Sequence, residues 1–151
     1  MEIKKAEYDD LCLILELQKL CYRENAVRYN DYKIQPLVQT IKELEEEFNK
    51  GIILKAVNQS GIIGSIRAYQ RDSICYIGKL IVNPDYQNKG IGKKLIAEIE
   101  NRFPDVSKYE LFTGFKDEKN IYLYAGSGYN IFKEENHGNS MKFLFLEKMR
   151  E

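Results

Sequence analysis

The apolar residues near the start of the chain recur at the period of a helix. After a short strand-like stretch at residues 2–6, hydrophobic side chains follow one another three or four positions apart over residues 11–21, which is the spacing of one helix face. An acidic residue, Asp9 or Asp10, stands in front of this pattern, where a helix cap is expected. We expect the helix to end near residue 22, because the sequence that follows is aromatic, charged and weakly periodic.

A second helix is predicted to begin at Pro36 and to stop at Gly51. Proline is favoured in the first turn of a helix, and glycine is favoured just beyond the last turn. The intervening sequence has an apolar side at helical spacing, formed by Leu37, Ile41, Leu44 and Phe48.

From residue 52 the apolar pattern changes to that of strands. Three runs ("IILKAV", "GIIGSIRAYQ" and "ICYIGKLIV") are separated by the turn signals "NQSG" and "RDS", which predicts an antiparallel meander. A helical pattern returns over residues 91–103 and ends at Pro104. A further strand ("KYELFTG"), a short helix capped by Asp117 and a last hairpin ("YNIFKEE" and "MKFLFLE") complete the chain.

The predicted order of elements is β-α-α-β-β-β-α-β-α-β-β. This mixture indicates an α/β or α+β fold built around a mixed sheet. No linker, repeat or low-complexity tract interrupts the 151 residues, and this length is typical of one ordinary domain. We therefore expect a single domain over residues 1–151.

Composition argues against several classes of protein. Lys and Arg together number 23, as do Asp and Glu, whereas a dedicated nucleic-acid-binding protein normally shows a basic excess. The apolar runs are far shorter than the roughly 20 residues of a membrane span, and the acidic start of the chain does not fit a signal peptide. The three cysteines lack the spacing of a metal or redox site. We expect a cytoplasmic protein with no metal centre that binds neither nucleic acid nor membrane.

The stretch "VNPDYQNKGIGKKL", residues 82–95, raises the question of a ligand. A dinucleotide-binding turn requires a third glycine, and Leu95 stands in its place. A P-loop requires Ser or Thr after its Gly-Lys pair, and here Lys94 follows Gly92 and Lys93. Neither of these two nucleotide-binding motifs is therefore present.

What remains is a loop that leads directly into a helix. The first N–H groups of a helix have no intrahelical partners, and together with the helix dipole they favour an anion. Gly90 and Gly92 allow a phosphate to approach the backbone without meeting a Cβ atom, and Lys89 and Lys93 add positive charge. These features predict a cofactor that carries a diphosphate.

The pattern Q-x-x-G-x-G, placed directly after a strand, resembles the acyl-coenzyme A signature of the GNAT superfamily of N-acetyltransferases. The order of elements resembles that superfamily across essentially the whole chain. The resemblance implies a mostly antiparallel central sheet flanked by helices, with acetyl-CoA (coenzyme A) as the cofactor. The residues implied to hold its diphosphate are Gln87, Asn88, Lys89, Gly90, Ile91, Gly92 and Lys93.

A second motif, "NIYLYAGSGY", resembles the helix-then-strand segment of the same superfamily. The resemblance implies that Tyr124 points toward the cofactor's sulfur and acts as general acid for the departing thiolate. Many relatives carry Asn seven residues before this tyrosine, where this chain has Asp117. Asn120 is therefore the candidate for the contact with pantetheine.

The strand before the signature has a role by resemblance alone. In the superfamily this strand bulges and separates from its neighbour near the positions of Leu80, Ile81 and Val82. Backbone groups there are implied to bind the pantetheine arm, and one N–H is implied to polarise the thioester carbonyl. An apolar run suits such a site, because a donor aimed at a developing oxyanion is more effective where water is excluded.

The implied reaction is direct attack of a primary amine, on a small-molecule or peptide acceptor, at the thioester. The amine must lose a proton, and Glu24 and Asp31 are the candidate bases because they lie between the first two predicted helices. The neighbouring Tyr22, Tyr29 and Tyr32 suggest an aromatic, anionic pocket for a small cationic acceptor. Homodimers are common in the superfamily. The competing interpretation is a non-catalytic acyl-CoA-binding sensor, which would keep the glycine loop but would not need Tyr124.

Overall fold

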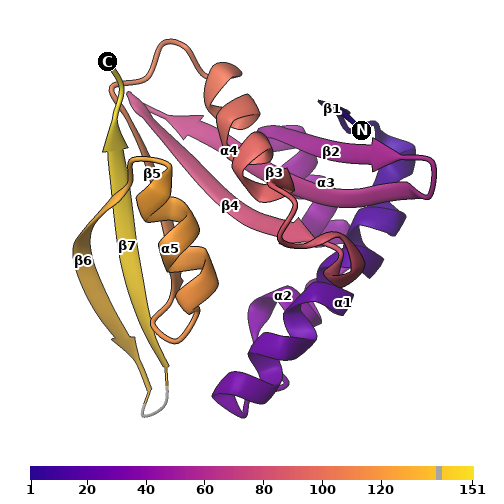
Figure 1. The fold of residues 1–151 in the computed structure, drawn as a ribbon, viewed down its shortest axis with the longest axis horizontal. Coiled ribbons are helices and arrows are strands. Elements are labelled where there is room, and N and C mark those ends of the chain that lie inside the picture. The colour runs from indigo at the N-terminus through magenta and orange to yellow at the C-terminus, as the bar shows by residue number, and fades with distance from the viewer. Residues whose placement is uncertain (139–140) are drawn as a thin grey trace.

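One seven-stranded mixed sheet, in the order β1-β2-β3-β4-β5-β7-β6, organises the molecule (Figure 1). The structure is a computed structural model that describes residues 1–138 and 141–151. Within that part of the chain, β4 and β5 form the only parallel pair, and the predicted meander and final hairpin are confirmed. The strands are β1 (Glu2–Lys5), β2 (Ile52–Asn58), β3 (Gly61–Arg71), β4 (Ile74–Val82), β5 (Lys108–Gly114), β6 (Asn130–His137) and β7 (Met141–Met149), and the helices are α1 (Leu11–Tyr29), α2 (Gln35–Val38), α3 (Ile41–Lys50), α4 (Ile91–Asn101) and α5 (Glu118–Gly126).

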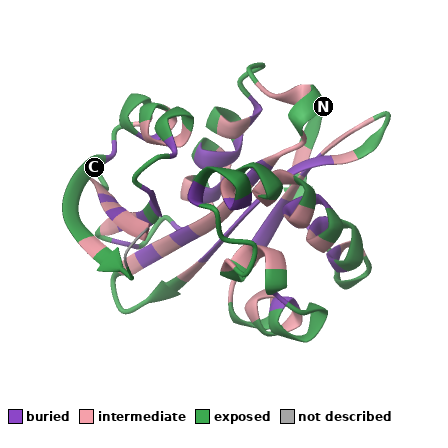
Figure 2. Ribbon diagram, turned by 90° about the horizontal axis from the view of Figure 1, so that it is seen from below, coloured by how far each residue is buried: buried purple, intermediate pink, exposed green. Residues whose placement is uncertain are grey.

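Helices cover both faces of the sheet. Side chains alternate between the two faces along a strand, so the neighbours Ile53 and Leu54 of β2 enter two different cores. Ile53 packs with residues of α1 and with Leu44 of α3, whereas Leu54 belongs to the larger core with Ile99 of α4. Burial on both sides explains why residues 63–68 of β3 are buried without interruption (Figure 2).

Helix α1 is longer than the sequence pattern predicts. It continues through Tyr29, not to residue 22, and ends at Asn30 in the left-handed conformation with φ 50°. In the additional turns only Ala26 and Tyr29 are buried. The charged residues around them face solvent, so the helical spacing of apolar residues is hard to recognise in this part of the sequence. With 19 residues α1 is the longest helix described. No helix in the described residues is long and apolar enough to cross a membrane.

The predicted second helix is in fact two helices. Thr40 is extended between α2 and α3, and its hydroxyl accepts the N–H of Glu43 (3.2 Å), so α3 begins with its own capping box. This break turns Ile41 outward, where it is 37% exposed, whereas Leu44 stays in the core. The T-x-x-E pattern at residues 40–43 was the available signal for this boundary.

The strand that leads to the glycine loop contains a bulge. Lys79 and Leu80 of β4 stand opposite Ile66 alone in β3, and Lys79 has a left-handed backbone with φ 52°. The resemblance implied a bulge at residues 80–82, and it lies slightly earlier. The pairing of β4 with β5 covers only Ile74–Tyr76 of β4, after which the two strands diverge (Figure 1).

An ion pair joins the start of α1 to the sheet. Asp10 does not cap α1 through its side chain; its carboxylate accepts hydrogen bonds from Lys55 Nζ (2.7 Å) and from the N–H of Glu7 (2.8 Å). Burial opposes ionisation of Asp10, but these two hydrogen bonds and the charge of Lys55 lower the pKa of the carboxyl below its ordinary value of 3.8. The unfolded chain therefore binds this proton more tightly than the folded chain, and the stabilisation is present above that ordinary pKa.

We expect Asp10→Asn to lower the melting temperature at pH 7 by about 2–8 °C, the effect of about 1–2 kcal/mol on a domain of this size. The difference in melting temperature between this variant and the parent protein should become smaller as the pH falls below 3.8 and passes through the lower pKa that Asp10 has in the folded protein. Thermal unfolding followed by circular dichroism at several pH values measures both effects. Asp9→Asn, on the exposed neighbour, is the control and should leave the melting temperature within 1–2 °C of the parent. A deficit that persisted unchanged into acid would contradict the ion-pair assignment.

Candidate active site

Two cavities meet beside the bulge of β4. The first, which we call the loop groove, has a volume of about 580 Å³ and is lined by the glycine loop and by parts of α1, β4, α4 and α5. The second, which we call the aromatic cavity, has a volume of about 770 Å³ and is lined mainly by parts of α1, β3, β4, β5 and β7. Five residues line both: Tyr22, Asn25, Leu80, Asp117 and Asn120. The junction of the two cavities is therefore where a group could pass from a ligand in one to a ligand in the other.

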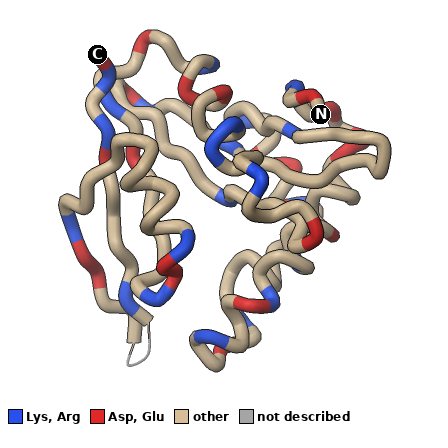
Figure 3. Tube along the Cα trace, viewed as in Figure 1, with Lys and Arg blue, Asp and Glu red and all other residues tan. Residues whose placement is uncertain are grey.

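The glycine loop forms a cradle of backbone N–H groups at one end of the loop groove. Asn88 (φ 63°) and Gly90 (φ 81°) both adopt the left-handed conformation, and no atom lies within 4 Å of a Cβ placed on Gly90. The first intrahelical bond of α4 runs from the N–H of Lys94 to the carbonyl of Gly90 (3.1 Å), so the N–H groups of residues 91–93 precede it. Basic residues cluster on this loop and on the first turns of α4 (Figure 3). This end of the groove suits an anion.

Two residues of the signature make contacts inside the protein. A Cβ on Gly92 would lie 3.1 Å from Cδ2 of Leu123, so this glycine allows α4 to approach α5. The Gln87 side chain donates through Nε2 to the carbonyl of Val82 (3.1 Å) and so ties the loop to the end of β4. Lys89 lies over the ring of Tyr86, with Nζ 5.5 Å from the centroid, and is the one signature residue outside the groove lining.

The backbone of Val82 faces away from β3. The N–H of the next residue, Asn83, donates to the carbonyl of Ile63 in β3 (2.8 Å), and successive residues of a strand point their N–H and C=O groups to opposite sides. The Val82 carbonyl accordingly accepts hydrogen bonds from Cys21 Sγ (3.3 Å) and from Gln87 on the side where β4 has separated from β5. The N–H of Val82 points to that same side.

Tyr124 of α5 lines the aromatic cavity and is only 6% exposed. Its hydroxyl makes no hydrogen bond to the described residues, and because the fully buried side-chain atoms without a partner are Gln18 Oε1 and Ser127 Oγ, this hydroxyl is open to the cavity. Burial raises the pKa of this phenol well above its ordinary value of 10, and the nearby Tyr22 and Asp117 raise it further. The hydroxyl is therefore protonated at any physiological pH and is free to donate.

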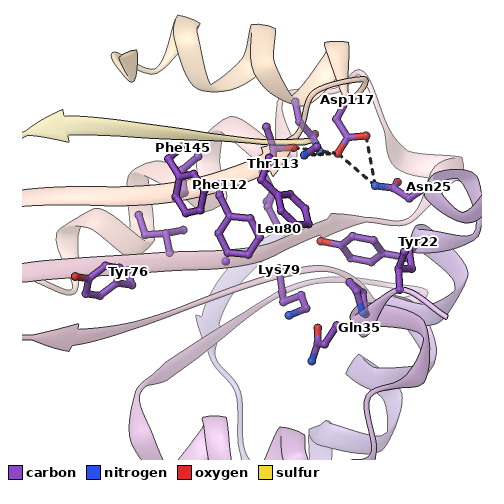
Figure 4. Close-up of a pocket in the computed structure, with 18 of the residues that line it drawn as sticks. Tyr22, Asn25, Gln35, Tyr76, Lys79, Leu80, Phe112, Thr113, Asp117 and Phe145 are labelled. Carbon is purple, nitrogen blue, oxygen red and sulfur yellow. Dashed lines mark hydrogen bonds between the residues drawn. The ribbon is translucent and has the colours of Figure 1, made fainter. Parts of the chain in front are cut away.

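Asp117 connects the two walls of the junction. The sequence pattern predicted a helix cap, but its side chain makes no capping bond to α5 and instead accepts hydrogen bonds from five groups of α1 and of the end of β5. Figure 4 shows those from Asn25 and from the end of β5. The donors are Tyr29 Oη (3.0 Å), Thr113 Oγ1 (3.0 Å), Arg28 Nη1 (3.0 Å), the N–H of Gly114 (3.1 Å) and Asn25 Nδ2 (3.3 Å). Asn120, one turn further along α5, is half-buried at the junction.

The structure separates the two candidate bases. Glu24 is exposed and lines the loop groove, whereas Asp31 is exposed, lines the aromatic cavity and accepts the N–H of Lys33 (2.9 Å). Tyr29 is buried against Asp117, and Tyr32 is 63% exposed and lines neither cavity. Tyr22, Tyr29 and Asp31 therefore share the aromatic cavity, as the sequence pattern suggested, whereas Tyr32 and Glu24 lie outside it.

A buried polar network that the sequence pattern did not reveal lies beside the aromatic cavity. Arg67 of β3 is 5% exposed and donates through Nη2 to Glu47 (3.1 Å) and to Gln39 Oε1 (2.9 Å), while its Nε also reaches Glu47 (3.3 Å). Gln18 of α1 is fully buried and donates to the same Gln39 oxygen (2.9 Å). An arginine inside the apolar run "GIIGSIRAYQ" was the one available signal. Lys79, on the bulge, was likewise missed because a left-handed lysine has no sequence signature.

Three solved structures illustrate the similarity of the fold. PaiA N-acetyltransferase from Thermoplasma acidophilum, in complex with coenzyme A, has a TM-score of 0.81 and 20% sequence identity, covering 99% of this chain and 98% of the other. Ribosomal-protein-S18-alanine N-acetyltransferase from Escherichia coli has a TM-score of 0.79 and 13% identity, with 98% and 92% coverage. A phosphinothricin acetyltransferase from Sinorhizobium meliloti, in complex with AcCoA, has a TM-score of 0.75 and 20% identity, with 98% and 87% coverage. The fold expected from the resemblance is confirmed.

The sequence itself carries the family assignment. No curated protein matches the chain. The sequence profile of the acetyltransferase (GNAT) family, however, matches residues 13–129, which include the glycine loop, the bulged strand and Tyr124. This chain belongs to the acetyltransferase (GNAT) family.

Proposed function

We propose that this protein transfers the acetyl group of acetyl-CoA directly to a primary amine. The observation that carries the proposal is the junction of the two cavities, where a groove that begins at an anion cradle meets a cavity lined by the unpartnered hydroxyl of Tyr124. Neighbours of the same fold have been solved with coenzyme A or AcCoA. The loop groove is then the coenzyme site, and the aromatic cavity is the acceptor site.

The residues of the loop groove fit the coenzyme. The N–H groups of residues 91–93, with Lys93 and the nearby Lys89, would hold the diphosphate, and the open space at Gly90 leaves room for it against the backbone. The backbone of residues 80–82 and the side chain of Asn120 would flank the pantetheine arm. When bound, acetyl-CoA supplies an acetyl group activated as a thioester.

Tyr124 holds the proton that a thiolate leaving group requires. Complete transfer from an ordinary phenol with a pKa near 10 to a thiolate with a pKa near 8.5 is uphill by about 2 kcal/mol, and burial of Tyr124 raises its pKa further. The hydroxyl therefore acts by donating a hydrogen bond, and its proton moves only in concert with proton loss from the amine. The N–H of Val82 polarises the acetyl carbonyl from the separated side of β4.

The proton of the amine needs a separate acceptor. Of the two carboxylates considered, only Asp31 lines the aromatic cavity, and we retain it as the candidate base. Glu24 lines the loop groove and would act only through intervening water.

The test of the proposed activity is acetyl-CoA turnover, measured as free thiol release with a panel of small-molecule and peptide amines. We expect thiol release that depends on both the enzyme and an added primary amine. Mass spectrometry of the acceptor should show the gain of one acetyl group. Thiol release without acceptor acetylation would mean thioester hydrolysis and would contradict the proposal.

The glycine loop offers a test of binding that does not depend on turnover. We expect Gly90→Asn to weaken coenzyme A at least 10-fold in calorimetric titration, because the added side chain enters the space that we assign to the diphosphate. The melting temperature should fall no more than in Gly61→Asn, because a side chain at either positive φ is strained although no protein atom lies within 4 Å of the new Cβ. Gly61→Asn is the matched control, at another open glycine with positive φ that lines neither cavity. Unchanged affinity in Gly90→Asn would remove the loop from the coenzyme site.

A further inference from the structure

The aromatic cavity contains a positive charge that the protein does not compensate. Lys79 lines the cavity from the bulge of β4, and no carboxylate among the described residues forms an ion pair with it. Figure 4 shows its side chain between the ring of Phe112 and the amide of Gln35. Arg67, its cationic neighbour, is already paired with Glu47. The ammonium of Lys79 is therefore left without an ion-pair partner of its own in this part of the cavity.

The other charged groups that line the cavity do not neutralise Lys79. Glu110 pairs with Lys108 (3.4 Å), and Asp117 pairs with Arg28 (3.0 Å). The remaining groups are Asp31, which is exposed, Lys50, whose Nζ lies 4.0 Å from the ring centroid of Tyr69, and His137, which lies 3.4 Å from Glu135. An anion that enters the cavity would thus find Lys79 available.

The position of Lys79 opposes stability. Burial lowers the pKa of its ammonium to about 8, the charge of Arg67 acts in the same direction, and the charge of Glu47 opposes both. A lysine with positive φ also has a strained backbone. Strained and unpaired groups of this kind cluster at functional sites. These observations indicate that Lys79 serves in binding and not in folding.

The opposite wall of the cavity is aromatic. Phe112 of β5 is 54% exposed, and its ring lies 5.1 Å from the centroid of Phe143 and 5.4 Å from that of Phe145, both on β7. Tyr76 of β4 lines the cavity as well. These rings offer apolar contact area to the body of an acceptor.

We propose that the acceptor is a primary amine that also carries a carboxylate and an aromatic or other large apolar group, as an aromatic amino acid does. The carboxylate pairs with Lys79, and the apolar group packs on the wall of Phe112, Phe143 and Phe145. This inference rests on the proposed acetyl transfer. It replaces the small cationic acceptor favoured by the sequence pattern, because a second cation would be repelled by the unpaired ammonium of Lys79.

Three amines that differ only at the carboxyl position test the inference. L-Phenylalanine, L-phenylalaninamide and 2-phenylethylamine share the amine and the ring. We expect kcat/KM for L-phenylalanine to exceed that of the other two at least 10-fold. Calorimetric titration of the three amines into the complex with coenzyme A should give the same order of affinity without any turnover.

The Lys79→Met variant, which keeps the chain length and removes the charge, supplies the second arm. We expect it to raise KM for L-phenylalanine at least 10-fold with little change in kcat, and to abolish the discrimination against 2-phenylethylamine. Coenzyme A affinity should be unchanged, and the melting temperature should equal or exceed that of the parent, because an unpaired buried ammonium is gone. Lys42→Met, on an exposed lysine of α3 that lines neither cavity, is the control.

Several results would reject the anionic acceptor, and they can be distinguished from results that would reject acetyl transfer itself. Equal or better turnover of the two amines without a carboxylate would reject the anionic acceptor while leaving acetyl transfer intact. A loss of kcat alone in Lys79→Met, for every amine, would make the lysine a proton acceptor instead. A lower melting temperature with equal losses for all three amines would make its role structural. Absence of coenzyme A binding by the parent would reject the function and the inference together.

Discussion

We expect replacement of Tyr124 by phenylalanine to lower kcat by about 100-fold or more and to leave the affinity for coenzyme A unchanged. A positioned general acid typically contributes about 10²–10⁴-fold to a rate, and the phenol hydroxyl lacks a partner among the described residues, so its loss leaves no buried group of the protein unsatisfied. Steady-state thiol release gives kcat, and calorimetric titration gives the affinity. Tyr32→Phe, on an exposed tyrosine that lines neither cavity, controls for the change of residue type.

The same variant separates an enzyme from a sensor that merely binds acyl-CoA. A sensor keeps the glycine loop, binds the coenzyme and shows no amine-dependent turnover in the parent protein. If kcat of the Tyr124→Phe variant stayed within threefold of the parent value, the protein would still be an enzyme, but Tyr124 would not be its general acid. Folding is not expected to interfere, since the aromatic ring remains in place in the core.

The second large effect concerns stability. Asp117→Ala should lower the free energy of unfolding by about 3–5 kcal/mol, because the change leaves three buried donors of α1 and β5 without their acceptor. For a domain of this size that loss lowers the melting temperature by roughly 6–20 °C. Urea titration and thermal unfolding measure the two quantities.

Asp117→Asn should have a smaller effect, because the amide oxygen can still accept a hydrogen bond although it cannot pair with the Arg28 charge. Asp105→Ala, on an exposed residue in the loop after α4, should be nearly silent. A drop of less than about 2 °C in Asp117→Ala would mean that the five hydrogen bonds do not join the two walls as their geometry indicates.

The order of strands and the glycine loop could be predicted because their signals are local. Each strand of the meander is bounded by turn residues within a few positions, and the start of α4 is marked by a glycine whose φ of 81° few other residues adopt. The errors arose where a contact distant in the sequence overrides local preference. Helix α1 continues to Tyr29 because that hydroxyl bonds to Asp117, 88 positions away. Helices α2 and α3 separate where Gln39 turns its side chain to Gln18 and Arg67.

The strands, the family and the loop suited to a diphosphate could thus be recognised from local patterns, since periodicity and backbone permissiveness are properties of neighbouring residues. Which charged side chains share the aromatic cavity depends instead on the packing of distant elements. A bulge at Lys79 and the separation of β4 from β5 set the direction in which each side chain points. These two features bring Lys79 and Arg67 beside the rings of β5 and β7 and place Glu24 in the other cavity. Such proximity depends on how elements pack, which no local pattern encodes.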